Sequence, residues 1–441
     1  MLHVIRRDGL LDRGFLEAHA VGWDELEPLL EPCTPSWGEE QTGVSAAEIE
    51  EAARVYGRGP SLLWMGQGLQ RQPLGGNLMR AIAALPAATG NLGRPGTGFL
   101  YLNGHESRRV DDDYIAAPGL GPDPPTISHM DLASYLTDPD RSRALLCWNM
   151  NPAASNPEQT VLHDALRRED LFTVVIDLFQ TDTADFADIV LPATSFLEHD
   201  DLVASYFNVS LSAQVKAAEP PGQALPNTEI FRRLAAALGY TEPELHEADR
   251  SLIDTVLERT GLGLGWDDLA ARGTVWISEE PLVQFPDLRF PTPSGKVELA
   301  SSAAEADGHP RTPLPLVDPR PTEGRLRLLS PASPWLLNAS FANDARISRK
   351  LGEPTIGLTR IDADALGVAA GDHVRVGSET GSLVLTVELT DVVQPGVAYA
   401  PKGRWPRRDG GANVNALVSG RKSDMGESTC VHATEITVTR A

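Results

Sequence analysis

The stretch VVIDLFQTDTADFADIVLPAT, residues 174–194, decides the fold that we expect for this chain. Its opening run, Val174 to Ile176, is β-branched and apolar, which is typical of a buried strand. Asp177 follows at the carboxyl end of that strand, where open α/β sheets place their ligands. Ile189 to Leu191 forms a second apolar run, which a proline closes. The segment therefore predicts an α/β domain with a polar loop at one sheet edge.

The loop between these two runs carries side chains that suit a polar ligand. Thr181, Thr183 and Asp185 offer helix caps and hydroxyl donors, so the loop can hold such a ligand over a helix N-terminus. A surface strand, loop and helix with ordinary caps is the alternative interpretation, and spacing alone favours it.

Composition limits the class of protein. A chain of 441 residues predicts two to four domains, and 41% hydrophobic with 22% charged residues predicts a folded globular protein. The net charge of −23 argues against nucleic acid or an anionic membrane as the main partner. The sequence has no apolar run long enough for a membrane span, and residues 1–8 lack the features of a signal peptide.

The three cysteines, Cys33, Cys147 and Cys430, are far apart and form no C-x-x-C motif. A disulfide framework, a zinc ribbon and an iron–sulfur cluster are therefore unsupported in this chain. Each cysteine is most simply a buried or semi-buried small hydrophobe.

Two further strand-to-loop junctions resemble the first one. Ser61 to Met65 predicts a buried strand that enters a loop with Gly66 and Gly68, where backbone N–H groups could approach a phosphate or a planar ring. The strand predicted over 144–148 leads into the loop Asn149 to Asn156, whose amides suit a ribose or a base. Ordinary tight turns and Asx turns explain both loops equally well on spacing alone.

The whole string from Ile176 to His199, ID-x-F-x-T-x-TA-x-x-AD-I-VLPA-x-x-x-x-E-H, resembles the molybdopterin oxidoreductase family of dimethyl sulfoxide reductases and formate dehydrogenases. In that family this segment lies against the guanosine end of a molybdopterin guanine dinucleotide. A guanine edge presents two adjacent N–H donors, which one carboxylate can accept. The resemblance thus makes Asp177 the first candidate for the guanine contact, with Thr181 and Thr183 near phosphate or ribose.

The resemblance extends through the chain in family order. Phe290 to Glu298 is close to the family string F-x-T-P-x-G-K-x-E, in which Lys296 could face a phosphate or pair with Glu298. Near the C-terminus, residues 338–341 and 413–415 match positions that line the pterin in the family. The residues that the resemblance implies at the cofactor are Gly66, Gly68, Asn151, Asn156, Asp177, Thr181, Thr183, Asp188, Lys296, Asn338, Asn413 and Asn415.

The predicted fold is α/β, with doubly wound parallel-sheet units followed by a C-terminal β barrel of the double-psi type. Strands of period two over 373–376, 383–388 and 397–400 indicate the barrel. We expect four parts: a partial nucleotide-binding domain over 1–120, a second one over 121–240, an irregular connecting region over 241–322, and the dinucleotide-binding barrel over 323–441.

The expected function is that of the cofactor-binding C-terminal portion of a molybdopterin-dependent oxidoreductase, which transfers an oxygen atom or dehydrogenates its substrate at molybdenum. The expected partners are a small-molecule substrate, a missing N-terminal segment or partner subunit, and an electron-transfer subunit. No residue is assigned as a metal ligand. The expected compartment is the cytoplasm. The alternative is a non-catalytic interaction subunit on the same fold, and a hydrolase finds little support because no G-x-S-x-G motif is present.

Overall fold

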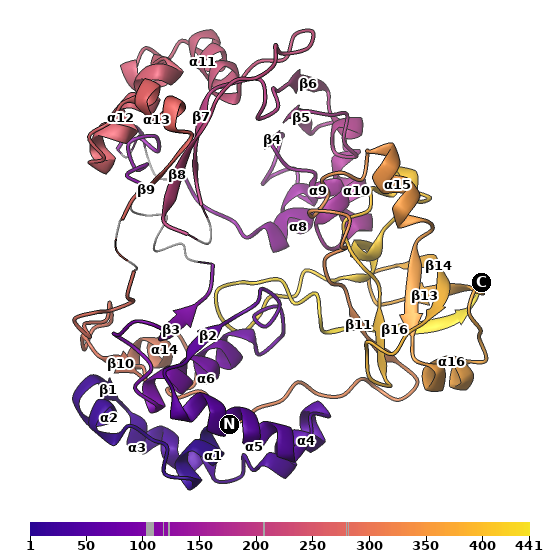
Figure 1. The fold of residues 1–441 in the computed structure, drawn as a ribbon. Coiled ribbons are helices and arrows are strands. Elements are labelled where there is room, and N and C mark those ends of the chain that lie inside the picture. The colour runs from indigo at the N-terminus through magenta and orange to yellow at the C-terminus, as the bar shows by residue number, and fades with distance from the viewer. Residues whose placement is uncertain (103–109, 118, 122–123, 206–207, 279, 281) are drawn as a thin grey trace. The chain divides into compact units, whose positions relative to one another are not determined.

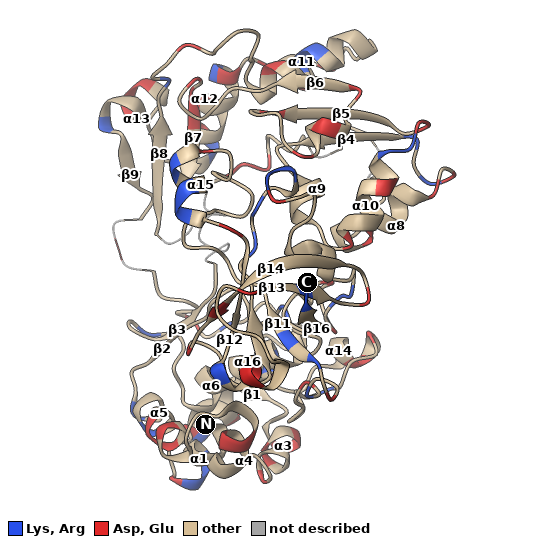
Figure 2. Ribbon diagram, turned by 90° about the vertical axis from the view of Figure 1, so that its right-hand side faces the viewer, with Lys and Arg blue, Asp and Glu red and all other residues tan. Residues whose placement is uncertain are grey.

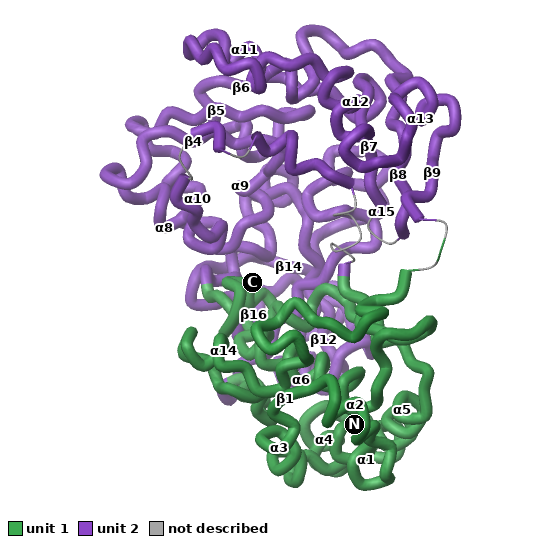
Figure 3. The backbone as a smooth tube through the Cα atoms, turned by 90° about the vertical axis from the view of Figure 1, so that its left-hand side faces the viewer, with its two compact units in different colours: residues 1–101, 280–321, 421–433 green, residues 102–279, 322–420, 434–441 purple. Residues whose placement is uncertain are grey.

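The computed structural model describes residues 1–102, 110–117, 119–121, 124–205, 208–278, 280 and 282–441. The chain forms two compact units, each assembled from three separate segments (Figure 3). Unit 1 contains residues 1–101, 280–321 and 421–433, and unit 2 contains residues 102–279, 322–420 and 434–441. The predicted division into four parts is finer than these units and stays a prediction.

Unit 1 is mainly helical, with two short parallel strand pairs (Figure 1). Its helices include α1 (Leu2–Arg7), α2 (Arg13–His19), α3 (Trp23–Leu26), α4 (Pro35–Thr42), α5 (Ala46–Arg58), α6 (Gly75–Ala88) and α14 (Ser302–Ala306). The strand pairs are β1 (Ala20–Val21) with β10 (Val297–Glu298), and β2 (Leu62–Trp64) with β3 (Gly98–Leu100). A capping box of Ser45 and Glu48 is present at the start of α5.

The strand predicted over Ser61 to Met65 forms as β2, but the prediction that it is buried is wrong. Leu62 is 49% exposed and Trp64 is 69% exposed, whereas Met65 at its end is buried. Within the described residues β2 pairs with β3 alone, so this narrow sheet leaves one of its faces uncovered.

A distant carboxylate caps the helix that follows the Gly66–Gly68 loop. Asp424 accepts hydrogen bonds from the backbone N–H groups of Gly76 and Asn77, at 2.7 and 2.9 Å, in the first turn of α6. The side chain of Asn77 in turn exchanges two hydrogen bonds with the backbone of Leu314. The protein's own aspartate therefore satisfies N–H groups that a phosphate could otherwise occupy.

The first part of unit 2 is a parallel three-stranded sheet of order β4-β5-β6 (Figure 1). Its strands are β4 (Ala144–Trp148), β5 (Phe172–Asp177) and β6 (Ile189–Pro192). The helices around it are α8 (Leu132–Thr137), α9 (Pro152–Ser155), α10 (Gln159–Leu166) and α11 (Asn227–Leu238), with the 3-10 turns η2 (His129–Asp131) and η3 (Ala184–Phe186). One face packs on α8 and α10 through Leu145, and the other packs on α11 through Ile176. Helices on both faces are the doubly wound arrangement that the sequence predicts.

The region over 241–322 is more regular than predicted. It contains η4 (Pro243–His246), α12 (Asp249–Thr260), α13 (Trp266–Arg272) and β9 (Thr274–Trp276), as well as β10 and α14 of unit 1. β9 joins β7 (Asp201–Ala204) and β8 (Ser210–Gln214) in an antiparallel sheet, which packs on α12 and α13. The buried residues of α12 are only Ile253, Val256 and Leu257, and most of the other residues are polar or charged. Because so narrow a stripe gives a weak periodic signal, the sequence analysis missed this helix.

The second part of unit 2 is a closed barrel of order β11-β15-β12-β14-β13-β16. Its strands are β11 (Leu326–Leu329), β12 (Thr355–Leu358), β13 (His373–Gly377), β14 (Ser382–Leu389), β15 (Val397–Tyr399) and β16 (Thr434–Arg440), with α15 (Ala345–Leu351) and α16 (Arg360–Leu366) between strands. Val374 and Val376 are fully buried while His373 and Arg375 are exposed, as period-two patterning requires. The predicted fold class is confirmed.

No helix in the described parts of the chain has the length and the apolar character that a membrane span requires.

Candidate functional site

Three loops follow the carboxyl ends of the parallel strands in unit 2. The loop after β4 contains Asn149 to Asn151, and the N–H of Asn149 donates to the carbonyl of Ile176 on the neighbouring strand at 3.0 Å. The loop after β5 begins at Asp177 and runs into η3, and the N–H of Ala193 after β6 donates to the Asp177 carbonyl. Because the strands are parallel, all three loops lie at one edge of the sheet.

Asp177 is a half-buried carboxylate at this edge. Its Oδ1 accepts the N–H groups of Leu178 and Phe179, at 2.7 and 3.4 Å. Within the described residues no protein donor bonds to Oδ2. Burial raises the pKa of Asp177 above its ordinary value, and the two backbone hydrogen bonds oppose that shift. Oδ2 thus has the capacity to accept N–H donors of a ligand.

Asn151 organises the two loops around it. Its Oδ1 accepts the backbone N–H of Thr183 at 3.1 Å and the Thr183 hydroxyl at 2.8 Å. Its Nδ2 donates to Asp182 at 3.1 Å. The Thr183 hydroxyl oxygen also accepts the N–H of Ala153 in α9. The sequence analysis singled out Asn151 and Thr183 separately, and the structure brings them into direct contact.

Three other predicted residues are engaged in local bonds. The Thr181 hydroxyl accepts the N–H of Ala184, at the start of η3. Asp188 accepts the N–H of Thr173 at 2.7 Å and so supports the start of the β5–β6 pair. Asn156 donates to the carbonyl of His129 at 2.7 Å. Their contact with a cofactor stays a prediction, and each has a structural task as well.

The predicted barrel residues Asn413 and Asn415 meet the sheet part of unit 2 at α9. Both side-chain amides donate to the carbonyl of Ala154, at 2.7 and 2.8 Å. Gln159 of α10, which is almost fully buried, accepts the N–H of Asn413 and donates to its Oδ1. The Asn413 amide is saturated within the protein, and the Asn415 amide makes one bond to the same carbonyl, so both residues hold the loop after β4 against the barrel loop 404–415.

The sequence analysis missed a second connection between the same segments. Arg407 lies in η5 (Pro406–Arg408), and its backbone N–H donates to Asp182 at 2.9 Å. Its guanidinium bonds to the carboxylate of Asp185 at 3.0 Å, and it also lies over the ring of the buried Trp405. The only signal in the sequence was the density of polar residues in the loop after β5.

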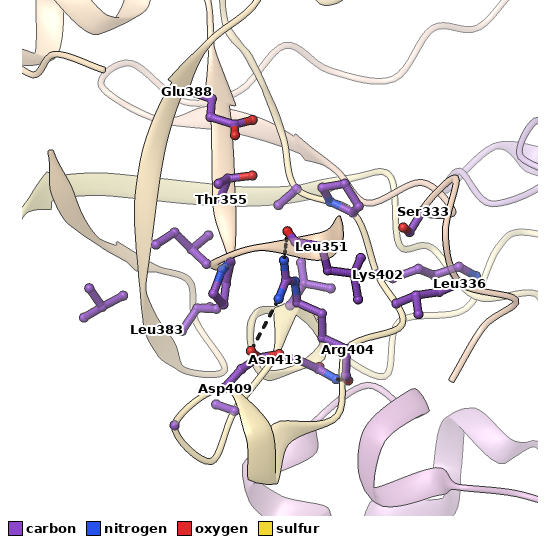
Figure 4. Close-up of a pocket in the computed structure, with 18 of the residues that line it drawn as sticks. Ser333, Leu336, Leu351, Thr355, Leu383, Glu388, Lys402, Arg404, Asp409 and Asn413 are labelled. Atoms are coloured by element: carbon purple, nitrogen blue, oxygen red, sulfur yellow. Dashed lines mark hydrogen bonds and ion pairs between the residues drawn. The ribbon is translucent and has the colours of Figure 1, made fainter. Parts of the chain in front are cut away.

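A cavity of about 450 Å³ lies beside these loops, on the barrel side (Figure 4). Residues 382–385 and Glu388 of β14 line it, together with residues from the segments 333–336, 350–355 and 400–414, and Asn413 is the one predicted site residue among them. Arg404 lies at its wall, where it donates to the carbonyls of Leu351 and Glu353 and pairs with Asp409. Burial raises the pKa of Asp409, while Arg404 opposes that shift.

The surface next to this cavity is basic although the chain as a whole is acidic. Figure 2 colours the Lys and Arg positions of α15 blue, and the sequence of this helix has Arg346, Arg349 and Lys350. Lys350 lies over the ring of Trp335 at 4.1 Å, and no salt bridge in the described residues involves these three cations. Such a surface favours an anionic ligand.

The remaining predicted residues are placed as follows. Asn338 is exposed and has a positive φ of 50°, in the loop between β11 and α15. Gly66, Gly68 and Lys296 belong to unit 1, whereas the other nine predicted residues belong to unit 2. A side chain at Gly66 would meet no atom within 4 Å, so this glycine borders open space. In unit 1 the Lys296 side chain has no hydrogen bond or ion pair within the described residues.

The chain is similar to several curated proteins over most of its length. A probable oxidoreductase of Bacillus subtilis, YoaE, is 34% identical over 97% of this chain and 63% of its own length. A putative catalytic subunit of dimethyl sulfoxide reductase from Halobacterium salinarum is 28% identical over 90% of this chain and 50% of its own. Formate dehydrogenase H of Escherichia coli is 26% identical over 92% and 60%. The chain thus spans between half and two thirds of the length of these curated relatives.

The fold also has a close counterpart among solved structures. Acetylene hydratase from Pelobacter acetylenicus superposes with a TM-score of 0.80 over all of this chain and 69% of its own, at 21% identity, which shows a shared fold. The family model for molybdopterin oxidoreductase matches residues 3–237, more than half of the chain, and that for the molydopterin dinucleotide binding domain matches residues 326–435. The chain therefore belongs to the molybdopterin oxidoreductase family.

Proposed function

We propose that unit 2 binds the guanine form of the molybdopterin dinucleotide, and that the chain forms the cofactor-binding portion of a molybdenum-dependent oxidoreductase. The observation that carries this proposal is the half-buried carboxylate of Asp177 at the carboxyl edge of the sheet, with Oδ2 available to a ligand. A carboxylate at such a position can accept the two adjacent N–H donors of a guanine edge.

The residues present fit the rest of this cofactor. The cavity of about 450 Å³ falls within the usual size range of small-molecule sites, and Asn413 lies in its wall. The exposed cations of α15 offer favourable electrostatics for phosphate groups. Asn151, Asn413 and Asn415 act by holding the binding loops together, because their amides are bonded within the protein.

When bound, the molybdenum centre supplies oxygen-atom transfer or dehydrogenation of a small-molecule substrate. The contribution of the residues in this chain is to bind the dinucleotide, to orient it and to tune its electrostatic surroundings. An electron-transfer partner and a cytoplasmic location belong to the proposal, and the metal ligand is not assigned.

The test is the guanine content of the purified chain. The Asp177→Ala variant should retain about a tenth or less of the guanosine nucleotide that the wild-type chain holds, because the substitution removes the charge-assisted contact. Asp364→Ala, at an exposed position of α16 with no salt bridge in the described residues, is the matched control. Equal guanine content in both variants would contradict the assignment.

Molybdenum and pterin analysis of the same samples tests the oxidoreductase part of the proposal. Guanine nucleotide together with pterin and molybdenum is the expected result. A chain that lacks molybdenum and pterin in cells that supply both would instead favour the non-catalytic interaction subunit.

A further inference from the structure

Asp182 is a buried carboxylate that the proposed contacts with the cofactor do not use. It is only 4% exposed, and no salt bridge within the described residues joins it to a cationic side chain. Its charge is balanced by two hydrogen bonds, one from the Asn151 amide and one from the backbone N–H of Arg407. Removing a carboxylate from water without a cation costs free energy. The two hydrogen bonds that Asp182 accepts offset this cost, and both depend on the positions of Asn151 and Arg407.

The two donors to Asp182 come from different parts of unit 2. Asn151 lies after β4, and Arg407 lies in η5, which belongs to the loop that connects the barrel strands β15 and β16. Asp182 itself lies after β5, five residues from Asp177 in the loop proposed to bind guanine. One side chain thus joins the sheet-edge loops to the barrel loop that carries Asn413.

A second, more exposed bond lies beside the buried one. The guanidinium of Arg407 contacts both carboxylate oxygens of Asp185, at 3.0 and 3.1 Å, and Gln180 donates to the same carboxylate. The backbone of Arg407 binds Asp182 and its side chain binds Asp185. The loop 178–185 therefore contacts η5 at two points. Two points fix an orientation, which a single hydrogen bond does not.

We infer that Asp182 is a positioning residue, which holds the guanine loop and the barrel loop at one spacing through Asn151 and Arg407. This inference rests on the proposed function, because the spacing matters for a ligand that touches both loops. In the proposed binding mode a dinucleotide would touch both loops, whereas a mononucleotide such as GMP would need only the first. Loss of the spacing should therefore weaken the longer ligand far more than the shorter one.

The test substitutes Asp182→Asn, which keeps the shape but removes one acceptor. The Asn151 amide and the Arg407 N–H bind different oxygens of Asp182, so an asparagine, which accepts with only one, cannot satisfy both. Amide hydrogen exchange of the wild-type chain, D182N and the control D364N gives the first measurement. We expect the Arg407 and Thr183 amides to exchange about tenfold faster or more in D182N alone. Unchanged exchange would overturn the inference.

The second measurement compares two ligands. GMP is titrated into the cofactor-free chain by calorimetry, and the dinucleotide retained by the purified chain is measured as guanosine nucleotide released by hydrolysis. In D182N we expect the GMP dissociation constant to stay within about twofold while retention of the dinucleotide falls about tenfold or more. Parallel losses for both ligands would show a merely structural role and would overturn the inference.

The outer pair provides a rescue experiment that does not depend on the folding of D182N. Asp185→Arg and Arg407→Asp should each lower dinucleotide retention, and the double exchange should restore most of it. If all variants are folded by circular dichroism and the double exchange does not restore retention, the two contacts of Arg407 with Asp182 and Asp185 do not hold the loops in place. If the wild-type chain binds neither GMP nor dinucleotide, the proposed function fails, whereas hydrogen exchange still decides whether Asp182 holds the loops.

Discussion

At Asp177, folding and binding place opposite demands on one carboxylate. Burial raises its pKa above the ordinary 3.8, which means that the charged form is less favourable in the folded chain than in the unfolded one. When the pKa of an acid is higher in the folded chain than in the unfolded one, the protonated acid stabilises the fold. This stabilisation is fully present below the unfolded pKa and is lost as pH rises through the folded pKa. At neutral pH, therefore, the charge of Asp177 costs stability, while the proposed guanine contact requires it.

The first prediction follows from this conflict. Asp177→Asn should raise the free energy of unfolding at neutral pH and should weaken GMP binding. In the wild-type chain GMP affinity should fall on acidification at a pH above that expected for an exposed aspartate, and the variant should lack this dependence. Chemical denaturation and calorimetric titration between about pH 4 and about pH 7 check both effects. A stability loss in Asp177→Asn would show that the backbone hydrogen bonds to Oδ1 outweigh the burial.

Individual residues of the site could be predicted from the sequence only in part. Asp177 could be predicted because an acidic residue directly after a strand is a pattern of neighbouring residues. The bond between Gln159 and Asn413 joins residues 254 positions apart, and no spacing rule anticipates it. Asp182 was overlooked for a related reason, since its importance depends on burial and on a backbone donor from η5. Tertiary contacts decide which polar residues are saturated, and a sequence does not show them.

The start of helix α6 shows how a distant residue completes an element. Asp424 accepts two N–H groups of its first turn, although it lies in the last tenth of the chain. We predict that Asp424→Ala lowers the free energy of unfolding by about 1–2 kcal/mol, as for the loss of other helix caps. Thermal and urea unfolding measure the change. Glu51→Ala, at an exposed position on α5, is the matched control and should behave as wild type.

The stability of the barrel depends on the side chains that its strands point into the core. Leu328 of β11 is fully buried in the barrel core, whereas Val392 after β14 is 76% exposed. Leu328→Ala should cost about 2–5 kcal/mol through the cavity that it leaves. Val392→Ala should change stability by less than about 0.5 kcal/mol. Similar losses for both, measured by denaturant unfolding, would mean that Leu328 is not packed in the barrel core.

Among the elements, regular patterning explains which ones the sequence revealed. The barrel strands β13, β14 and β15 lie close to the predicted ranges, because their alternation is strict. Helix α11 ends before Gly239, which adopts the left-handed conformation that commonly ends helices. Strand β7 was missed because it is exposed along most of its length, so it has no buried face to produce an alternating pattern.

For the molecule as a whole, the net charge of −23 dominates the electrostatics. Mutual repulsion among acidic groups opposes compact structure, and salt screens it. Raising sodium chloride from about 20 mM to about 500 mM shortens the Debye length from about 20 Å to about 4 Å. We predict a rise in the unfolding midpoint of a few degrees, measured by calorimetry at pH 7. A fall would mean that surface ion pairs such as Arg54 with Asp8 contribute more than repulsion costs.

The interleaving of the two units has a consequence for how the protein is made. Unit 1 needs the segment 421–433, which supplies Asp424 to helix α6, and unit 2 needs β16 after it. On the ribosome, unit 1 lacks one of its parts until residues 421–433 have emerged from the exit tunnel, and unit 2 lacks one until residues 434–441 have emerged. Residues 1–420 are therefore synthesised before either unit can be complete, whereas a linear array of domains can fold one domain at a time during synthesis.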